Sequence, residues 1–499
     1  MSTEFYSSVS RYGNSLLYRG YDLEGKRIKK RVKYKPRLFV PDPKSKSEWK
    51  TMDGVSVKPL DFDTMKEFRE FNDNYKDVAN FQTYGIENHV TSFLQRKFPG
   101  QIDYDRRLIN VVNFDIETAI GEGFPHPDVA AEEIRAITAH STRDGKYHIW
   151  FLAGSKEYRP HKDEIAYQYS TETELLQSFL AWWEDSYYSP DILTGWNTRF
   201  FDVPYLINRV IRVLGEKEAK KFSPWRVLNS REVQQFEARW TNTKETVYEI
   251  SGIQHLDYIE LFKKFAYTYG NQESYSLNHI SHVVLGEAKL DYSDIGNLND
   301  LYEQDPQKFI EYNRKDVELV NRIDDRLGLI DIVLTIAYMA GVNYEDALKT
   351  TPVWDSIIYR RLAKDKIVVP TKHDNPAKVK FEGGFVKEPN PGMYEWMMSF
   401  DLNSLYPNII VQWNMSPETL LPEKNEQVSV DKIVEGQSFA EPDTAVAANG
   451  AKFSTKKQGV IPSLVSELYD ARKANKKKMI EEKKRKEGLI QELQKLSSS

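Results

Sequence analysis

The sequence contains no cysteine, and it also lacks long apolar runs. The absence of cysteine excludes disulfide bonds and thiolate metal sites, and it fits a protein of a reducing compartment. No apolar run is long enough to cross a bilayer, and residues 1–8 have neither the basic start nor the apolar centre of a signal peptide. These absences lead us to expect a cytoplasmic protein, in the host cytoplasm if it is viral, that works without a membrane.

The length and charge of the chain suggest several domains and one strongly basic region. A chain of 499 residues exceeds what a single core ordinarily serves, and 40% hydrophobic residues are typical of a folded protein. The net charge of −5 does not favour a nucleic-acid binder. However, cations dominate between Arg472 and Lys486, and a local basic stripe matters more for nucleic-acid binding than the total charge.

An apolar, strand-like run at residues 111–118 carries two carboxylates. In a strand alternate side chains share a face, so Asp115 and Glu117 lie on one face while Phe114 and Ile116 lie on the other. Neighbouring carboxylates repel each other, and a bound cation would offset this repulsion. Oxygen ligands favour magnesium or manganese over zinc. Taken alone, the run fits either half of a metal site or a strand end whose acids face solvent.

Two further segments carry acids on predicted helices. Residues 191–194 predict a strand that leads through a Gly-Trp-Asn turn to a helix with Pro204 in its first turn. Asp202, close before this proline, is most simply interpreted as the residue that caps the helix. Later in the chain, Tyr312 and Asp316 are four residues apart and therefore share one face of a predicted helix. Alone, such a pair is typical of a protein surface.

Together, the three segments resemble the three exonuclease motifs of the DnaQ-like, ribonuclease-H-like 3′→5′ exonucleases. The matching patterns are Asp-x-Glu on a strand, Asn-x-x-x-Phe-Asp at a helix start and Tyr-x-x-x-Asp on a late helix. The resemblance implies two magnesium or manganese ions, one activating water and the other stabilising the leaving 3′ oxygen. It also implies that four acids are metal ligands: Asp115, Glu117, Asp202 and Asp316. Tyr312 would orient the attacking water, and Asn197 and Phe201 would position the primer terminus.

Other regions carry weaker signals. Residues 233–250 predict a hairpin, which in polymerase-linked exonucleases helps part the primer from the template and which also fits a purely structural role. Lys289 is a candidate phosphate contact. Basic and aromatic residues interleave over residues 27–34, as expected either for an edge strand with a solvated face or for a single-stranded nucleic-acid surface. Apolar residues at helical spacing over 331–369 indicate packing helices.

A second chemical stretch begins near residue 397. We expect an apolar strand that ends at Asp401 and turns into a short helix whose free N–H groups point back toward the acid. A carboxylate that holds a metal ion, together with backbone donors at a helix N-terminus, can cradle a triphosphate. A capped helix without a ligand is the alternative.

This stretch resembles motif A of family B DNA polymerases, and the order of all the motifs is similar to that of the T-even bacteriophage type over essentially the whole chain. The resemblance implies that Asp401 is a polymerase metal ligand and that Tyr406 packs under the deoxyribose to reject ribonucleotides. Phe381 stands where the family usually has tyrosine, which removes a hydroxyl contact to the template. The resemblance also implies nucleotide contacts by the motif A turn and by two cations of a fingers helix, and DNA contacts by a linker loop: Leu402, Asn403, Ser404, Leu405, Tyr406, Arg472 and Lys476 for the nucleotide, and Gly383 and Gly384 for the DNA.

The printed residues lack two motifs that the family's polymerase site needs. These are a Tyr-Gly-Asp-Thr-Asp type hairpin, which supplies the second palm carboxylate, and a Lys-x-x-x-Asn-Ser-x-Tyr-Gly type fingers helix. Because one palm carboxylate cannot hold two metal ions, we expect the N-terminal, proofreading subunit of a split replicative polymerase, with an artificial truncation as the other origin. A stand-alone 3′→5′ exonuclease with a vestigial palm, and a regulatory protein that binds RNA or single strands, are the alternatives.

The expected fold class is α/β in a multidomain chain. We expect an N-terminal mixed domain (1–105), a ribonuclease-H-like exonuclease domain (106–328), a helical return segment that packs with the N-terminal domain (329–371), a partial palm with motif A (372–458) and a first fingers helix (459–499). The expected partners are a DNA primer–template, single-stranded 3′ ends, dNTP and a second polymerase chain, with a sliding clamp as a further candidate. An apolar stripe over residues 489–496 would pair with the second chain.

Overall fold

The computed structural model describes residues 4–497 except 45, 76–77, 79–80, 122, 124, 153–157, 235–243, 292–294 and 372–385. The chain forms two compact units. The first comprises Met1–Arg37, Asp61–Asp77 and Ile86–Ile357, and the second comprises Leu38–Leu60, Val78–Gly85 and Ile358–Ser499. The mixture of helices and sheets agrees with the predicted α/β class.

A six-stranded mixed sheet is the centre of the first unit, in the order β10-β9-β8-β7-β11-β14. Strand β8 runs antiparallel to both of its neighbours, whereas β7, β11 and β14 are mutually parallel. The strands are β7 (Val111–Thr118), β8 (Ile134–Ser141), β9 (Lys146–Leu152), β10 (Glu164–Tyr169), β11 (Ile192–Thr194) and β14 (Gln254–His255). The strand predicted from alternation at residues 111–118 is therefore confirmed, and it lies inside the sheet.

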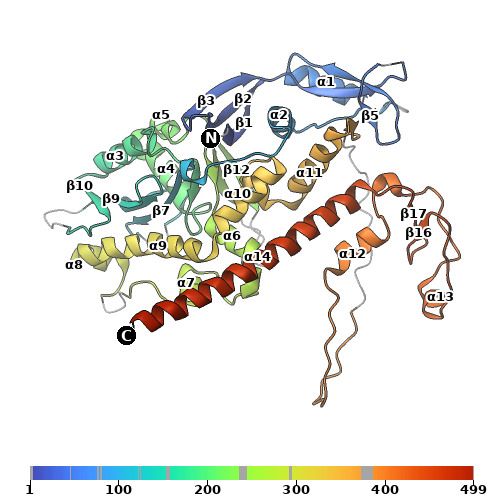
Figure 1. Cartoon of the computed structure of the whole chain (residues 1–499). Coiled ribbons are helices and arrows are strands. Elements are labelled where there is room, and N and C mark those ends of the chain that lie inside the picture. Colours follow the sequence, from blue (N-terminus) through green and yellow to red (C-terminus); the bar gives the residue numbers. More distant parts are fainter. Residues whose placement is uncertain are drawn as a thin grey trace. The chain divides into compact units, whose positions relative to one another are not determined.

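Helices cover both faces of this sheet (Figure 1). On one face, α3 (Glu172–Glu184) and α4 (Asp202–Leu214) pack on Phe114 and Ile116 of β7. On the other face, α8 (Leu298–Gln304) and α9 (Pro306–Leu327) pack on apolar residues of β8 and β9. Because the period of two sends Phe114 and Ile116 to the first face, the intervening acids of β7 face α9.

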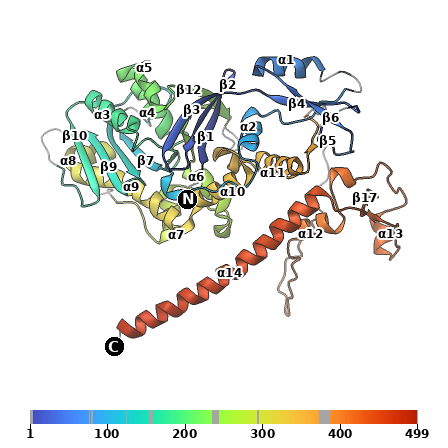
Figure 2. The same cartoon turned by 45° about the horizontal axis from the view of Figure 1, so that its top comes forward.

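The N-terminal sheet of the same unit has the order β1-β2-β3, and all of its pairs are antiparallel (Figure 2). Strand β3 is an edge strand with exposed lysines, as predicted. Helix α10 packs against this sheet, and the Tyr338 hydroxyl donates to the backbone oxygen of Tyr6 over 2.7 Å. The elements not yet bounded are β1 (Phe5–Tyr12), β2 (Ser15–Tyr21), β3 (Arg27–Lys33), α1 (Met65–Tyr75), α2 (His89–Lys97), α5 (Glu216–Ala219), β12 (Leu228–Gln234), β13 (Lys244–Ile250), α6 (Tyr258–Phe265), α7 (Leu277–Leu285), α10 (Leu329–Ala340) and α11 (Thr350–Lys364).

The second unit combines short strand pairs with one long helix. Strands β4 and β6 pair with each other, as do β5 with β15 and β16 with β17. Their bounds, with those of the helices, are β4 (Arg37–Pro41), β5 (Lys50–Thr51), β6 (Val57–Asp61), β15 (Ile367–Val368), α12 (Leu405–Gln412), α13 (Val430–Val434), β16 (Thr444–Val446), β17 (Lys452–Ser454) and α14 (Val460–Ser497).

Helix α14 confirms the long helical pattern predicted near the end of the chain. Its first turn is fixed by two hydrogen bonds, from the Gly459 N–H to Asn414 Oδ1 over 2.8 Å and from the Val460 N–H to Glu418 Oε1 over 2.6 Å. Pro462 and Leu464 are buried in this part of the helix, whereas residues 470–495 are exposed. Within the described part of the chain, no helix has the length and apolar character that crossing a membrane requires.

Candidate functional site

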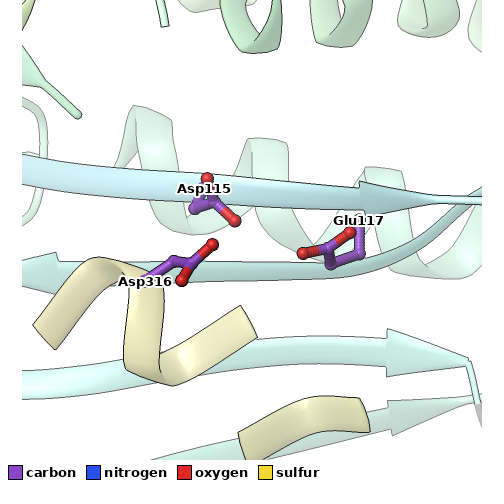
Figure 3. Close-up of side chains that lie close together, drawn as sticks. All are labelled: Asp115, Glu117 and Asp316. Carbon is purple, nitrogen blue, oxygen red and sulfur yellow. The ribbon is translucent and has the colours of Figure 1, made fainter. Parts of the chain in front are cut away.

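Three carboxylates converge between β7 and α9 (Figure 3). Asp115 and Glu117 point from β7 toward Asp316 of α9, and one oxygen of each lies within 4.8 Å of the others. Asp316 is buried, and the two strand acids are only partly exposed. The alternative in which the strand acids simply face solvent is therefore wrong, because α9 covers them.

Helix α9 supplies two further side chains to the site in addition to the carboxylate of Asp316. Tyr312 lies one turn before Asp316 on the same face, as the spacing of four predicts, and both are buried. The side chain of Asn313 donates to Asp115 Oδ2 over 2.8 Å and accepts a hydrogen bond from the Thr138 hydroxyl of β8. Asn313 thus ties α9 to two strands at once. The sequence carried no signal for this residue beyond its place next to Tyr312.

Asp202 approaches the site from beyond the end of β11. Strand β11 ends at Thr194, opposite Asn113, so the backbone of β7 beyond that point has no partner from β11. Asp202 Oδ1 fills the gap by accepting from the Ile116 N–H over 3.1 Å. The interpretation of Asp202 as a helix cap is wrong, because Phe201 holds the cap position and Asp202 is the first residue of α4. Asp202 does not belong to the group of oxygens within 4.8 Å.

The turn between β11 and α4 depends on Gly195 and on a buried aspartate, Asp257. A Cβ atom on Gly195, whose φ is +157°, would lie 2.6 Å from the backbone oxygen of Phe114. Asp257 accepts hydrogen bonds from the N–H groups of Asn197 (3.1 Å) and Arg199 (2.8 Å), and it also caps α6. Asp257 was not predicted as a site residue, although an aspartate just before a helical pattern is a signal for a cap.

The two residues predicted to position the primer terminus lie on this turn. Asn197 has a left-handed backbone with φ of +64°, a conformation that asparagine tolerates. Phe201 is partly exposed, and its ring centroid lies 5.7 Å from that of Tyr205. Their roles toward DNA stay predictions.

A lysine from the loop between α7 and α8 enters the carboxylate cluster. Lys289 Nζ forms an ion pair with Asp316 Oδ2 and donates to the Tyr312 hydroxyl over 3.4 Å. Its backbone N–H donates to Asn278 Oδ1 over 2.8 Å, which fixes the loop. The sequence suggested only a phosphate contact for Lys289. The ion pair could not be foreseen, because its partners are 27 residues apart and meet only through the packing of α9.

The pKa values of the acids in the site are raised, so these groups keep their protons more readily than free carboxyl groups do. Burial raises the pKa of Asp115 well above its usual range, and the three neighbouring carboxylates raise it further. Burial also raises the pKa of Glu117 to about 8 and that of Asp202 to about 7. Burial disfavours the charged form of Lys289, but Asp316 and its neighbours outweigh this and raise the lysine pKa above its ordinary value.

The donor set fits divalent cations. All the candidate ligand atoms are carboxylate oxygens, the type that magnesium and manganese prefer. Among the described residues, the buried Asp316 Oδ1 has no hydrogen-bond partner, as expected of an oxygen that serves a cation. A single ammonium from Lys289 offsets only part of the charge of four acids. Asp115, Glu117 and Asp316 are thus the residues best arranged to hold a metal ion, with Asp202 at their edge.

Motif A lies in the second unit and differs from the expected geometry. Residues 397–400 form no strand, and Asp401 is exposed, as are Leu402 and Tyr406. The prediction of a strand here is wrong for this structure. A strand needs a neighbour for its N–H and C=O groups, and the described residues of this unit supply none at this position. The short helix is confirmed as α12, with Ser404 at its cap position in a left-handed conformation.

The remaining predicted residues are not brought together with Asp401 by a contact. Arg472 and Lys476 lie four residues apart on α14 and are exposed. Within the described residues, no hydrogen bond or ion pair joins either of them to Asp401. Phe381, Gly383 and Gly384 lie outside the described residues. The hairpin predicted over residues 233–250 is confirmed as the antiparallel pair β12 and β13, but β12 begins earlier, at Leu228; residues 235–243 lie outside the described residues.

Comparison with protein families separates the same two regions. A model described as DNA polymerase family B, exonuclease domain, matches residues 90–280, and one described as DNA polymerase family B matches residues 351–497. The chain belongs to DNA polymerase family B. The family B exonuclease match includes Asp115, Glu117 and Asp202, and the second match includes motif A and α14. Helix α9, with Asp316, lies outside both matched ranges.

Family B proteins of two phages align with almost the whole chain. The DNA-directed DNA polymerase of Enterobacteria phage T4 is 33% identical over 506 residues, which cover 96% of this chain and 54% of that protein. The DNA-directed DNA polymerase of Escherichia phage RB69 is 32% identical with the same coverage. DNA polymerase II of Escherichia coli (strain K12) is 24% identical over 417 residues, which cover 79% of this chain and 47% of that protein. The chain therefore spans about half the length of these relatives.

Proposed function

We propose that this chain removes nucleotides from the 3′ end of single-stranded DNA, as the proofreading part of a replicative DNA polymerase. The observation that supports this most is the convergence of Asp115, Glu117 and Asp316, with oxygens within 4.8 Å of one another. A cluster of carboxylates beside a lysine and a tyrosine suits the metal-assisted hydrolysis of a phosphodiester.

The chain's own residues would divide the work as follows. The four acids would hold two divalent ions, which would polarise the attacking water and stabilise the leaving 3′ oxygen. The Tyr312 hydroxyl would orient the water. Asn197 and Phe201 would hold the terminal nucleotide. The water oxygen bonds to phosphorus as the bond from phosphorus to the 3′ oxygen of the preceding nucleotide breaks, which releases a nucleoside 5′-monophosphate.

A double substitution tests this proposal. Changing both Asp115 and Glu117 to alanine should abolish shortening of a 5′-labelled single strand in magnesium, because two of four ligands are lost. The fold should remain, since both changes remove mutually repelling acids. The matched control changes Glu70 and Asp73, two exposed acids of α1, to alanine and should keep full activity. Undiminished nuclease activity in the first variant would mean that catalysis occurs elsewhere.

We further propose that the chain supplies the motif A half of a polymerase site. Asp401 would hold a metal ion, the turn from Leu402 to Tyr406 would cradle the dNTP, and Arg472 with Lys476 would grip its phosphates. The second palm carboxylate is not encoded in the printed residues. A second chain would provide it together with the rest of the fingers and a thumb. A primer–template and a sliding clamp are further proposed partners, and the proposed location is the cytoplasm of a phage-infected host.

A reconstitution experiment tests the polymerase half. Full chain, magnesium, dNTPs and a labelled primer–template are combined with and without a polypeptide that carries the missing palm hairpin. Shortening that changes to extension supports the split polymerase, and Arg472→Ala should then slow extension without slowing shortening. Shortening that the second polypeptide does not convert would favour a stand-alone exonuclease instead.

The expected segments at 1–105, 106–328, 329–371, 372–458 and 459–499 remain the proposed domain assignment. Limited proteolysis with mass spectrometry tests it, and cleavage clustered near residues 105, 328 and 371 is the expected result. Resistance at all of these positions would contradict the assignment.

A further inference from the structure

A basic cleft lies in the first unit, away from the carboxylate cluster and without a residue in common with it. Its volume is about 290 Å³, and its wall carries five cations and one acid. The cations come from two distant parts of the chain, the N-terminal sheet and the segment after α5: Arg19, Arg27, Lys29, Lys221 and Arg226. None of these residues has a part in the proposed exonuclease reaction.

The strand register explains why three of the cations share one face. Arg19 of β2 pairs with Lys29 of β3, and directly paired residues of an antiparallel sheet point to the same side. Arg27 lies two residues from Lys29 and therefore also points there. On the opposite face of β3, Ile28 and Val32 pack against the hydrophobic core. The charged face is therefore set by the fold and not by the chance position of flexible side chains.

The acids near the cleft do not balance its cations. Glu184 is shared by Lys221 and Arg226, Asp191 is shared by Arg19 and Arg27, and Glu218 pairs with Lys221. Five cations thus meet three carboxylates, which leaves an excess of two positive charges. Among the described residues, no carboxylate pairs with Lys29, whose ammonium donates to the backbone oxygen of Pro224 over 2.8 Å.

Arg19 is the most deeply buried cation of the group. Burial is the main cause that lowers the pKa of Arg19 to about 10; Asp191 opposes it, and the neighbouring Arg27 adds to it. An anion in the cleft would relieve this repulsion. Arg19 itself is held by backbone oxygens, including that of Gly252 at 2.9 Å, so its position does not depend on a ligand.

We propose that this cleft binds a phosphate monoester. Such a group carries a charge between about −1.5 and −2 at neutral pH, which matches the excess of the cleft. Guanidinium and ammonium groups have five and three N–H donors, so Arg27, Arg226 and Lys29 keep donors beyond those used in the contacts described. The volume suffices for a phosphate with its sugar. The bound monoester belongs either to a free nucleotide or to the 5′ end of a nucleic-acid strand.

Calorimetric titration of the full chain with dGMP in EDTA tests the proposal. Wild-type protein should bind one dGMP saturably. The double variant Lys29→Gln/Arg226→Gln should bind about tenfold more weakly or worse, since two charge-assisted contacts are lost. The matched control is Lys33→Gln/Arg231→Gln, which removes the same charge from β3 and β12 outside the cleft and should bind as wild type. Equal weakening in both variants, or no saturable binding by wild type, would overturn the proposal.

Two further arms separate this site from the exonuclease site and identify the source of the phosphate. Binding must persist in Asp115→Ala, and its loss there would assign dGMP to the exonuclease site and overturn the proposal. A short oligothymidylate with a 5′-phosphate is then used to displace dGMP. If the 5′-phosphorylated oligothymidylate displaces dGMP and the 5′-hydroxyl form does not, the bound phosphate belongs to the end of a nucleic-acid strand. If neither form displaces dGMP, the ligand is a free nucleotide. Equal displacement by both forms would contradict recognition of a monoester.

Discussion

Asparagine in place of Asp257 should loosen the turn that carries Asn197 and leads to Asp202. The carboxylate of Asp257 is fully buried and accepts three backbone N–H groups, those of Asn197, Arg199 and Ile259. Asparagine keeps the shape but offers one acceptor oxygen, so its amide nitrogen faces at least one N–H donor. A buried donor without an acceptor costs about 1–3 kcal/mol, and we expect about 2 kcal/mol here.

Scanning calorimetry and nuclease kinetics measure the two consequences. The melting temperature of the first unit should fall by roughly 4–8 °C, on the scale of a few degrees per kcal/mol for a domain of this size. The rate of single-strand shortening should fall at saturating DNA, because the turn carries Asn197 and Phe201, which we propose hold the terminal nucleotide. The control is Asp305→Asn, which affects a cap with one hydrogen bond, to the Lys308 N–H, and should cost less. An unchanged melting temperature in Asp257→Asn would refute the reasoning.

Four other predictions concern the same site. Burial raises the pKa of Glu117 to about 8 and that of Asp202 to about 7, so magnesium binding near pH 7 must release protons. The magnesium affinity should therefore rise between pH 6 and 8 by about tenfold per pH unit for each proton released. Calorimetry in buffers of different ionisation enthalpy checks this, and a pH-independent affinity would contradict it. In EDTA the folded protein keeps the Glu117 proton that the unfolded chain loses above pH 4.5, so the free energy of unfolding should fall as pH rises from 4.5 to 8. Gly195→Ala should lower both stability and activity, because the added Cβ would lie 2.3 Å from Thr198 Cγ2. Gly215→Ala, also at positive φ but with open space around the added Cβ, should lower stability only. Equal losses of activity in the two variants would show that backbone strain, and not crowding, is the cause. Lys289→Met removes the ammonium that lowers the carboxylate pKa values, so the nuclease pH profile should move to higher pH, and an unmoved profile would contradict the role given to the ion pair.

The local periodicity of the sequence was enough to predict which residues of β7 and which residues of α9 share a face. Alternation along residues 111–118 placed Asp115 and Glu117 on one face, and the spacing of four placed Tyr312 and Asp316 on another. These predictions hold because each depends on a single element, a strand or a helix, whose period is fixed by the backbone. The long C-terminal helix was predictable for the same reason, and the hairpin predicted over 233–250 was found although its first strand begins earlier, at Leu228.

Features that depend on distant segments were not predictable. The end of β11 at Thr194 was predicted, but the contact of Asp202 with β7 also depends on the pairing of β11 with β7, which no local pattern encodes. Lys289 and Asn313 join the site through the packing of α9. The strand expected at 397–400 also depends on a distant segment. Its apolar residues need a neighbouring strand, which the described part of the second unit does not provide.

The most direct test of the account compares two aspartates of the same helix. Asp316 is buried and faces β7, whereas Asp325 lies further along α9 and is exposed. The full-length chain with Asp316→Asn should leave a 5′-labelled single strand intact in magnesium, while Asp325→Asn should shorten it at the wild-type rate. Equal shortening by the two variants would show that the carboxylate cluster between β7 and α9 is not the catalytic site.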